Sequence, residues 1–183
     1  MQVRQTELPG VLVIEPAVHR DDRGFFLETW RADTYRQAGI DLPFVQDNQS
    51  HSAAGVLRGL HAQLGAPLGK LVRCVGGAIF DVAVDVRRGS PHFGRWVGVT
   101  LSAANCHQLW VPPEFLHGFC VVEGPAEVEY KCTALWSRDD EIAVRWDDPQ
   151  LAIAWPIAAP RLSDKDAAAP LLADIVDRLP RYS

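Results

Sequence analysis

The sequence lacks any long apolar run: no segment approaches the roughly 20 consecutive apolar residues that a transmembrane helix requires. Residues 1–7 also lack the apolar core of a signal peptide, so we expect a cytoplasmic protein. Lysine is scarce, with 3 residues against 15 arginines, and the net charge is −5. A general nucleic-acid or anionic-membrane binder would need a basic surface, so neither kind of partner is expected.

Cysteine is scarce too, and its residues have no CxxC spacing of the kind found in zinc sites and redox pairs. We expect buried, reduced thiols at Cys74, Cys106, Cys120 and Cys132. Some metal-binding barrels use a close His-x-His pair with a nearby Glu. Here Gln63 stands two residues after His61, and no acid follows within the next several residues. The sequence therefore predicts a site without a metal.

The patterning predicts one domain, residues 1–183, of mainly β structure. The composition shows no break, and the chain is long enough to bury a substantial core. Short apolar runs are separated by Gly, Pro and Asn at close spacing, which indicates an antiparallel sandwich or barrel and not a βαβ fold. Residues 8–14 read as a turn and then a short strand, and further strands are expected over residues 25–30, 56–61, 70–75, 80–87, 96–101, 107–111, 118–122 and 126–135.

Several segments add detail to this pattern. Residues 80–87 alternate strictly, as in a half-buried strand, and Gly76-Gly77 before them predicts a hairpin turn. Residues 19–24 read as a charged loop, and a short helix is expected over 32–38. Helical signals return at about 163–180. We expect a barrel closed by this C-terminal segment through one apolar face: Leu171, Leu172, Ile175, Val176 and Leu179.

The strand at 56–61 ends in His61, and Lys70 follows after a loop broken by Gly and Pro. A base beside a fixed ammonium could remove a proton next to a ketone and hold the resulting enolate. The alternative is a core histidine with a hydrogen-bond partner and a surface lysine. Taken alone, His61 and Lys70 favour the core histidine and the surface lysine. Residues elsewhere in the chain favour the catalytic interpretation.

Two further residues could join this pair. Tyr130 shares a strand face with Ala126 and Val128, so it points inward, either as a core tyrosine or as a catalytic one. Ser163 and Asp166 precede a helix and could form a capping box. Alternatively, Asp166 reaches the histidine and fixes its tautomer. The two roles exclude each other only if backbone groups fully occupy the carboxylate.

Arginines in or beside strands could hold an anionic ligand through bidentate contacts. The candidates are Arg23, Arg58 and Arg145, and for Arg145 we prefer the alternative of a surface ion pair. Arg58 and His61 are three residues apart, so a regular strand would place them on opposite faces. A bulge at Gly59 would bring both to one side. Otherwise Arg58 serves the site of a neighbouring subunit.

Motifs along most of the chain point to one family. They are Gly59-Leu60-His61, Gly69 to Val72, Phe80 to Asp85, Gly89-Ser90-Pro91, Leu101 to Asn105, His117-Gly118-Phe119, Tyr130-Lys131 and Ser163 to Asp166. From about Leu8 to Asp166 the chain resembles the dTDP-4-dehydrorhamnose 3,5-epimerase family. The resemblance implies a metal-free jelly roll of the cupin type, no cofactor, and a homodimer that exchanges strands within about residues 1–45. The implied substrate is a dTDP-linked 4-keto-6-deoxyhexose, inverted at C3 and C5 in dTDP-L-rhamnose biosynthesis.

The resemblance also implies roles for individual residues. His61 would be the base, paired with Asp166. Tyr130 would be the acid on the opposite face of the sugar, and Lys70 would lie against the enolate oxygen at C4. Trp136 would stack on thymine, with core packing as the alternative. Further contacts with the nucleotide sugar would come from Arg23, Glu28, Gln46, Asp47, Asn48, Arg58, His117, Glu141 and Lys165.

Four residues depart from the family pattern. Ala62 replaces the usual Tyr or Phe and could widen the pocket, and Leu68 stands where Gln is common. Glu114 and Leu116 replace Gly and Ala in the turn before the second histidine. Glu114 bears on the local backbone, since Gly often marks a positive φ.

The chemistry suits these residue types without the family. Inversion beside a ketone needs proton removal on one face and delivery on the other, so two groups on opposite walls are expected. One alternative is a related epimerase that acts only at C3 or on another deoxysugar intermediate. A second is a cupin that only binds a sugar or nucleotide, against which the four proposed catalytic residues count together. A metal-dependent cupin oxygenase or isomerase is more distant.

Overall fold

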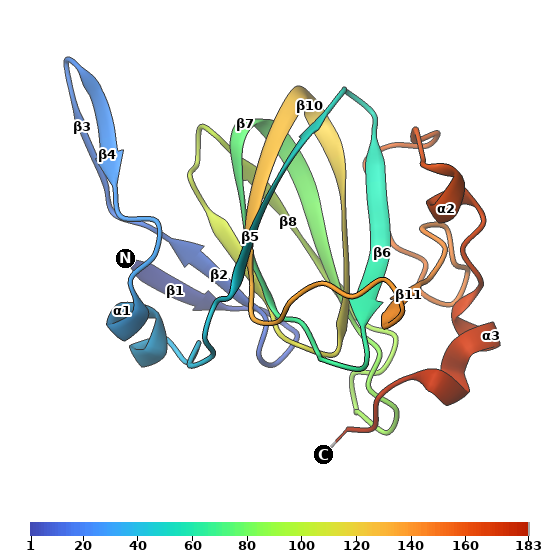
Figure 1. Cartoon of the computed structure of the whole chain (residues 1–183). Helices are drawn as coiled ribbons and strands as arrows, with labels where there is room; N and C mark the ends of the chain where they lie inside the picture. The colour runs from blue at the N-terminus through green and yellow to red at the C-terminus, as the bar shows by residue number, and fades with distance from the viewer. Residues whose placement is uncertain (183) are drawn as a thin grey trace.

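The computed structural model describes residues 1–182, and β-strands dominate it (Figure 1). The strands are β1 (Gln2–Gln5), β2 (Leu12–Glu15), β3 (Val18–Asp21), β4 (Gly24–Leu27), β5 (Gln46–Ser52), β6 (Leu57–Gln63), β7 (Lys70–Asp85), β8 (Trp96–Ser102), β9 (Gln108–Val111), β10 (Phe115–Cys132) and β11 (Glu141–Ala143). The helices are α1 (Ala32–Gln37), α2 (Asp164–Ala167), α3 (Leu172–Ile175) and the 3₁₀ turn η1 (Val176–Arg178). None of the helices in this described part is long and apolar enough to cross a membrane.

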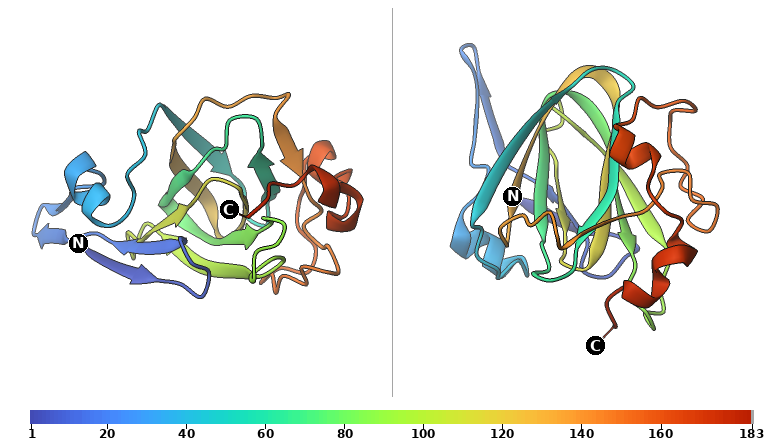
Figure 2. Two further views of the ribbon diagram at one scale, coloured as in Figure 1. Left: turned by 90° about the horizontal axis from the view of Figure 1, so that it is seen from below. Right: turned by 45° about the vertical axis from the view of Figure 1, so that its right-hand side comes forward.

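Two long antiparallel strands, β7 and β10, run through both layers of the barrel. The main sheet has the order β1-β2-β9-β7-β10-β6-β11, with β5 also beside β10 and β8 beside β7. The first part of β7 pairs with β9 and its later part with β8. Likewise, the first part of β10 pairs with β6 and its later part with β5. The sheet thereby curls over on itself as an antiparallel jelly-roll barrel (Figure 2). The predicted fold class is confirmed.

The predicted hairpin at Gly76-Gly77 is wrong, because β7 continues through both glycines and bends there. Gly77 has φ +70°, and a Cβ on it would lie 2.4 Å from the carbonyl oxygen of Glu123. The register between β7 and β10 shifts at the same level. Inward side chains carry even numbers before the bend and odd numbers after it. The strands expected at 118–122 and 126–135 are likewise one strand, β10, which ends at Cys132.

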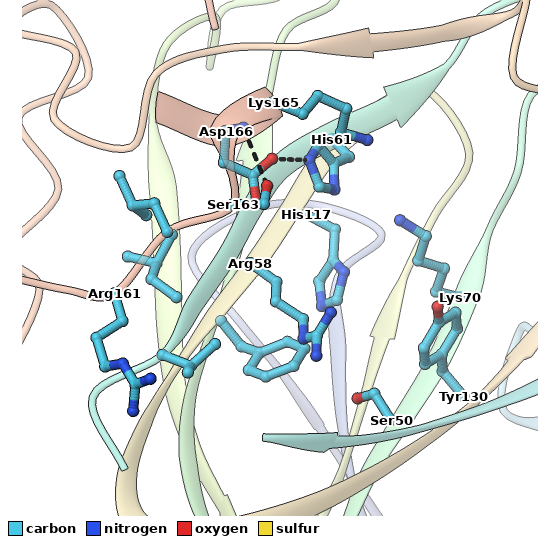
Figure 3. Close-up of a pocket in the computed structure, with 14 residues that line it drawn as sticks. Ser50, Arg58, His61, Lys70, His117, Tyr130, Arg161, Ser163, Lys165 and Asp166 are labelled. Carbon is cyan, nitrogen blue, oxygen red and sulfur yellow. Dashed lines mark hydrogen bonds and ion pairs between the residues drawn. The ribbon is translucent and has the colours of Figure 1, made fainter. Parts of the chain in front are cut away.

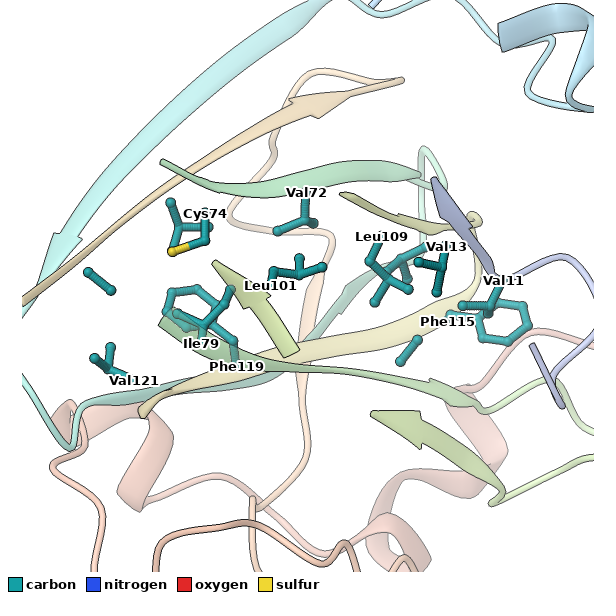
Figure 4. Packing of buried hydrophobic residues seen from close by; sticks show 14 of the residues in the cluster. Val11, Val13, Val72, Cys74, Ile79, Leu101, Leu109, Phe115, Phe119 and Val121 are labelled. Atoms are coloured by element: carbon teal, nitrogen blue, oxygen red, sulfur yellow. The ribbon is translucent and has the colours of Figure 1, made fainter. Parts of the chain in front are cut away.

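The barrel interior is filled by aliphatic and aromatic side chains, among them Val72, Leu109 and Phe119 (Figure 4). A second cluster packs the outer side of β6, β7 and β10 against the C-terminal helices. Because both sides are covered, the later part of β7 is buried on both faces. The alternation in the sequence predicts burial on one face only. Leu172, Ile175 and Leu179 belong to the second cluster, and Val176 packs at its edge, whereas Leu171, expected on the same face, is not part of it.

A hairpin of β3 and β4 stands apart from the barrel (Figure 1). The expected charged loop at 19–24 contributes to this hairpin, which forms its own two-stranded sheet. Phe25 and Phe26 on it are 56% and 71% exposed, which leaves two large apolar side chains without cover within the described residues. The predicted helix at 32–38 is confirmed as α1, and its Tyr35 is buried.

Candidate active site

A cleft opens into the barrel between β5, β6, β7 and β10. It has two adjoining parts of about 440 and 370 Å³ that share Ser50, Arg58, His61, Lys70 and Tyr130. One part extends along α2, and the other extends to the loop between β10 and β11. A long ligand could therefore lie across the shared residues with its two ends in the two parts.

His61 and Asp166 form a close pair at one side of the cleft (Figure 3). His61 Nε2 lies 2.6 Å from Asp166 Oδ1, and the side chains are 22% and 4% exposed. Burial tends to raise the pKa of Asp166, but the hydrogen bond and charge of His61 outweigh it and the pKa is lowered. The Ser163 hydroxyl caps α2 by accepting a hydrogen bond from the backbone N–H of Asp166 at 3.1 Å. The cap thus leaves the carboxylate facing the ring, and only the Ser163 half of the predicted capping box is present.

Arg58 lines the same cleft as His61 because β6 is irregular between them. Arg58 pairs with Phe119 of β10 and His61 with His117, so an interval of three residues on β6 lies opposite an interval of two residues on β10. Gly59 lies between them with φ +125°, and a Cβ there would approach the backbone of β10 to 2.6 Å. The predicted bulge at Gly59 is confirmed.

Lys70 and Tyr130 lie together on the other side of the cleft (Figure 3). Burial lowers the pKa of Lys70, although nearby Cys132, Asp81 and Glu141 act in the opposite direction. Burial also raises the pKa of Tyr130 above its ordinary value. The predicted inward orientation of Tyr130 is confirmed, since it packs at the edge of the interior cluster. The raised pKa favours the protonated form of the phenol.

His117 and Asp81 form a second pair, buried between β10 and β7. His117 Nε2 lies 2.7 Å from Asp81 Oδ1. Burial lowers the pKa of His117, and the carboxylate opposes this effect. The sequence predicts that His117 lies at a turn before a strand, but in the structure it lies inside β10. The alternation around Asp81 predicts a half-buried strand and carries no signal for this buried pair.

Three alternate residues of strand β5, Gln46, Asn48 and Ser50, line the cleft, and Gln49 also borders it. The Ser50 hydroxyl is buried without a hydrogen-bond partner among the described residues. Asp47 faces away from these three and accepts two hydrogen bonds from Lys131 Nζ, each 3.0 Å long. The structure therefore brings Gln46 and Asn48 to the site but not Asp47. Ser50 had no signal in the sequence beyond its place in the alternation.

Trp136 stands on the loop at the far end of the cleft. Its side chain belongs to no core cluster and the residue is 53% exposed, so core packing is wrong as an explanation for it. Trp136 Nε1 donates to Glu141 Oε2 at 2.8 Å, and Lys165 forms an ion pair with the other oxygen of Glu141. Burial tends to raise the pKa of Glu141, but these two hydrogen bonds outweigh it and lower the pKa.

Two more predicted binding residues, besides Asp47, lie away from the cleft of their own chain. Arg23, at the turn of the β3–β4 hairpin, pairs with Asp21, and Glu28 pairs with Arg31. Neither Arg23 nor Glu28 lines either part of the cleft. Arg145 forms the surface ion pair preferred for it, with Asp147.

The departures from the family pattern fall in different places. Glu114 has φ 71°, so a non-glycine residue occupies a left-handed conformation before β10. Ala62 and Leu68 line the part of the cleft near Trp136, and Leu116 is fully buried in the core.

Over residues 1–182, no group of three or more His, Cys, Asp or Glu side chains is arranged to hold a metal ion.

Comparison with known proteins adds independent findings. A family profile described as dTDP-4-dehydrorhamnose 3,5-epimerase matches residues 5–174. The enzyme of that name from Shigella flexneri is 52% identical, over 91% of this chain and 93% of its own length. The solved structure of a 3,5-epimerase from Legionella pneumophila, in complex with dTDP-4-keto-L-rhamnose, is 48% identical with a TM-score of 0.97 and covers 100% of this chain and 98% of that one. A 3′-monoepimerase from Streptomyces bikiniensis in complex with dTDP-quinovose is 37% identical, with a TM-score of 0.91 over 97% of this chain and 92% of that one.

Proposed function

The chain belongs to the dTDP-4-dehydrorhamnose 3,5-epimerase family, and from this premise we propose how the residues of its cleft divide the reaction. It is an epimerase that inverts C3 and C5 of dTDP-4-dehydro-6-deoxy-D-glucose to give dTDP-4-dehydro-L-rhamnose. The observation that carries the division of roles is the His61–Asp166 pair, which shares one cleft with Lys70 and Tyr130.

Proton removal falls to His61. A hydrogen on carbon beside the C4 ketone leaves as a proton, and its electron pair moves into an enolate with charge on the C4 oxygen. The buried Asp166 carboxylate stabilises the imidazolium formed in this step and holds the ring orientation. The Lys70 ammonium stabilises the enolate oxygen, as donors in an oxyanion hole do, an effect of about 3 kcal/mol when one donor is removed.

Proton delivery falls to Tyr130, from the opposite face of the sugar. Its raised pKa makes the phenol a group that keeps its proton until the enolate, a stronger base, lies beside it. Each inversion leaves His61 protonated and Tyr130 deprotonated. Exchange with water must restore both before the next carbon reacts, so both new hydrogens originate from solvent.

The nucleotide would occupy the part of the cleft near Trp136, with thymine stacked on the exposed ring. Arg58, which lines both parts of the cleft, and Lys165, which pairs with Glu141, supply positive charge for the diphosphate. Gln46, Asn48, His117 and Glu141 complete the polar lining of the two parts. Contacts with these non-reacting groups hold the sugar ring between acid and base.

The hairpin of β3 and β4 suggests a homodimer. Arg23 and Glu28 lie away from their own cleft, and Phe25 and Phe26 are exposed beside them. In the proposed dimer, the hairpin of one chain reaches the cleft of its partner and delivers Arg23 and Glu28 there.

The four cysteines are free thiols, which suits the reducing cytoplasm that we propose as the location.

Mixing two defective variants tests this arrangement. Arg23→Ala damages the hairpin and His61→Ala the cleft. In a mixed dimer, the intact cleft of the first chain would receive the intact hairpin of the second, so activity should recover on mixing. If Arg23 serves its own chain, no site is complete and activity stays low. Light scattering at micromolar concentration should give twice the chain mass, and a monomer would contradict the dimer.

A C3-only epimerase is the second candidate. The observation in its favour is the altered lining near Trp136, where Ala62 and Leu68 stand in place of larger or polar residues. Incubation with dTDP-4-dehydro-6-deoxy-D-glucose, followed by NMR of the product, separates the candidates. Inversion at both carbons supports the 3,5-epimerase, and inversion at C3 alone supports the second candidate.

A further inference from the structure

Gln63 is a buried glutamine on β6 whose amide bonds only to backbone. The residue is 4% exposed. Its Nε2 donates to the carbonyl oxygens of Ala66 at 2.7 Å and Leu135 at 3.0 Å, and its Oε1 accepts from the N–H of Ser137 at 2.7 Å. Both amide hydrogens are thereby used. Although Gln63 borders the cleft, it has no donor left for a ligand.

Two of these backbone partners flank Trp136. The N–H of Trp136 itself donates to Gln46 Oε1 at 3.0 Å, so glutamines from β6 and β5 hold three consecutive residues of the loop. Leu135 and Trp136 are both exposed and belong to no core cluster. Hydrogen bonds therefore define where the Trp136 ring stands, since apolar packing does not.

We propose that Gln63 is a positioning residue that fixes Trp136 at the nucleotide end of the cleft and thereby sets the affinity for the nucleoside diphosphate. The proposal rests on the proposed function, in which Trp136 stacks on the base. Gln63 lies two residues after His61, so one strand orients both the proton acceptor and the loop for the nucleotide. The role needs a side chain with both a donor and an acceptor, which a carboxylate or an aliphatic residue does not provide.

A double-mutant cycle tests the proposal. Gln63→Leu should raise KM and the Kd for dTDP by about tenfold, because three hydrogen bonds to the loop are lost, while kcat stays within about twofold. Gln63→Glu should act in the same direction, since its carboxylate would face two carbonyl oxygens. In a Trp136→Ala background, Gln63→Leu should change KM by less than about twofold, because its effect passes through the missing ring.

Hydrogen exchange of the peptide around Ser137 gives a second readout. Gln63→Leu should accelerate exchange there, and thermal unfolding identifies a variant that is not folded, in which case Gln63→Glu replaces it. Unchanged exchange, a fall in kcat at constant KM, or an equal rise in KM with and without Trp136 would each overturn the proposal. If Trp136→Ala leaves dTDP binding unchanged, the stacking role in the proposed function fails, and with it the claimed link to affinity. The exchange experiment would still show whether Gln63 holds the loop.

Discussion

The substitution Asp166→Asn removes one negative charge from the cleft and keeps the size of the side chain. The backbone N–H that Ser163 accepts remains, so the cap of α2 is preserved. In the proposed mechanism, proton transfer to His61 creates an imidazolium whose Nε2 lies 2.6 Å from the carboxylate. The two side chains are mostly buried, so water screens the pair only partly. An amide can hold the ring but does not compensate its charge.

The size of the effect follows from the geometry of the pair. The centres of charge lie about 4 Å apart, and at an effective dielectric constant of about 20 their attraction is about 4 kcal/mol. A tenfold change in rate corresponds to about 1.4 kcal/mol, so kcat should fall by about 10³-fold. The Kd for dTDP should change little, because the lost charge acts on the imidazolium formed during the reaction.

The assay combines turnover of the 4-keto sugar nucleotide with calorimetry of dTDP binding. Ser163→Ala is the matched control: it removes the cap and should lower the free energy of unfolding by about 1 kcal/mol while largely preserving kcat. A near wild-type kcat for Asp166→Asn would refute the reasoning and leave Asp166 a residue of the helix terminus. An equal loss of kcat in Ser163→Ala would refute it too, since that variant keeps the carboxylate.

Three further predictions concern the other parts of the site. With the Tyr130→Phe variant in heavy water, carbon-bound hydrogen of the substrate should exchange for deuterium with retention of configuration, because His61 still removes and returns the proton. The rate of inversion should fall by about 10²–10⁴-fold. NMR of the recovered sugar nucleotide measures both effects, and inversion near the wild-type rate would make Tyr130 a core residue only. Lys70 is proposed to act as an ammonium, and burial lowers its pKa, so kcat/KM should fall as pH rises through a value below 10.5, and Lys70→Arg should shift that fall to higher pH. An unchanged profile would assign the titration to another group. Activity should survive EDTA, because Gln63 stands where a metal-binding pair would need histidine and its amide is committed to backbone; loss of activity that one divalent ion restores would contradict this.

Strand parity predicted much of the site, because a period of two fixes which neighbours share a face. It placed Tyr130 inward and required a bulge at Gly59 to bring Arg58 beside His61. Parity would also have separated Asp47 from its neighbours on β5, but that run was taken over whole from the family resemblance.

Features that depend on distant partners were not predictable. A glycine pair can open a turn or bend a strand, and whether β7 reverses at Gly76-Gly77 depends on β10 passing alongside. The alternation around Asp81 predicts one exposed face, because the local pattern does not show that the barrel interior lies on the Asp81 side of β7 and the C-terminal helices on the other. Gln63 carries no local signal for this role, since two of its three partners lie in a loop about 70 residues further along the chain.

The most direct test of two proton-transfer groups acting on both carbons is wild-type turnover of dTDP-4-dehydro-6-deoxy-D-glucose in heavy water, followed by NMR at C3 and C5. The account predicts one deuterium at each carbon and inverted configuration at both, because each new hydrogen comes from a group that exchanges with solvent. Inverted product without deuterium at these carbons would contradict proton transfer through exchangeable groups. Deuterium and inversion confined to C3 would contradict the assignment of both centres to this cleft.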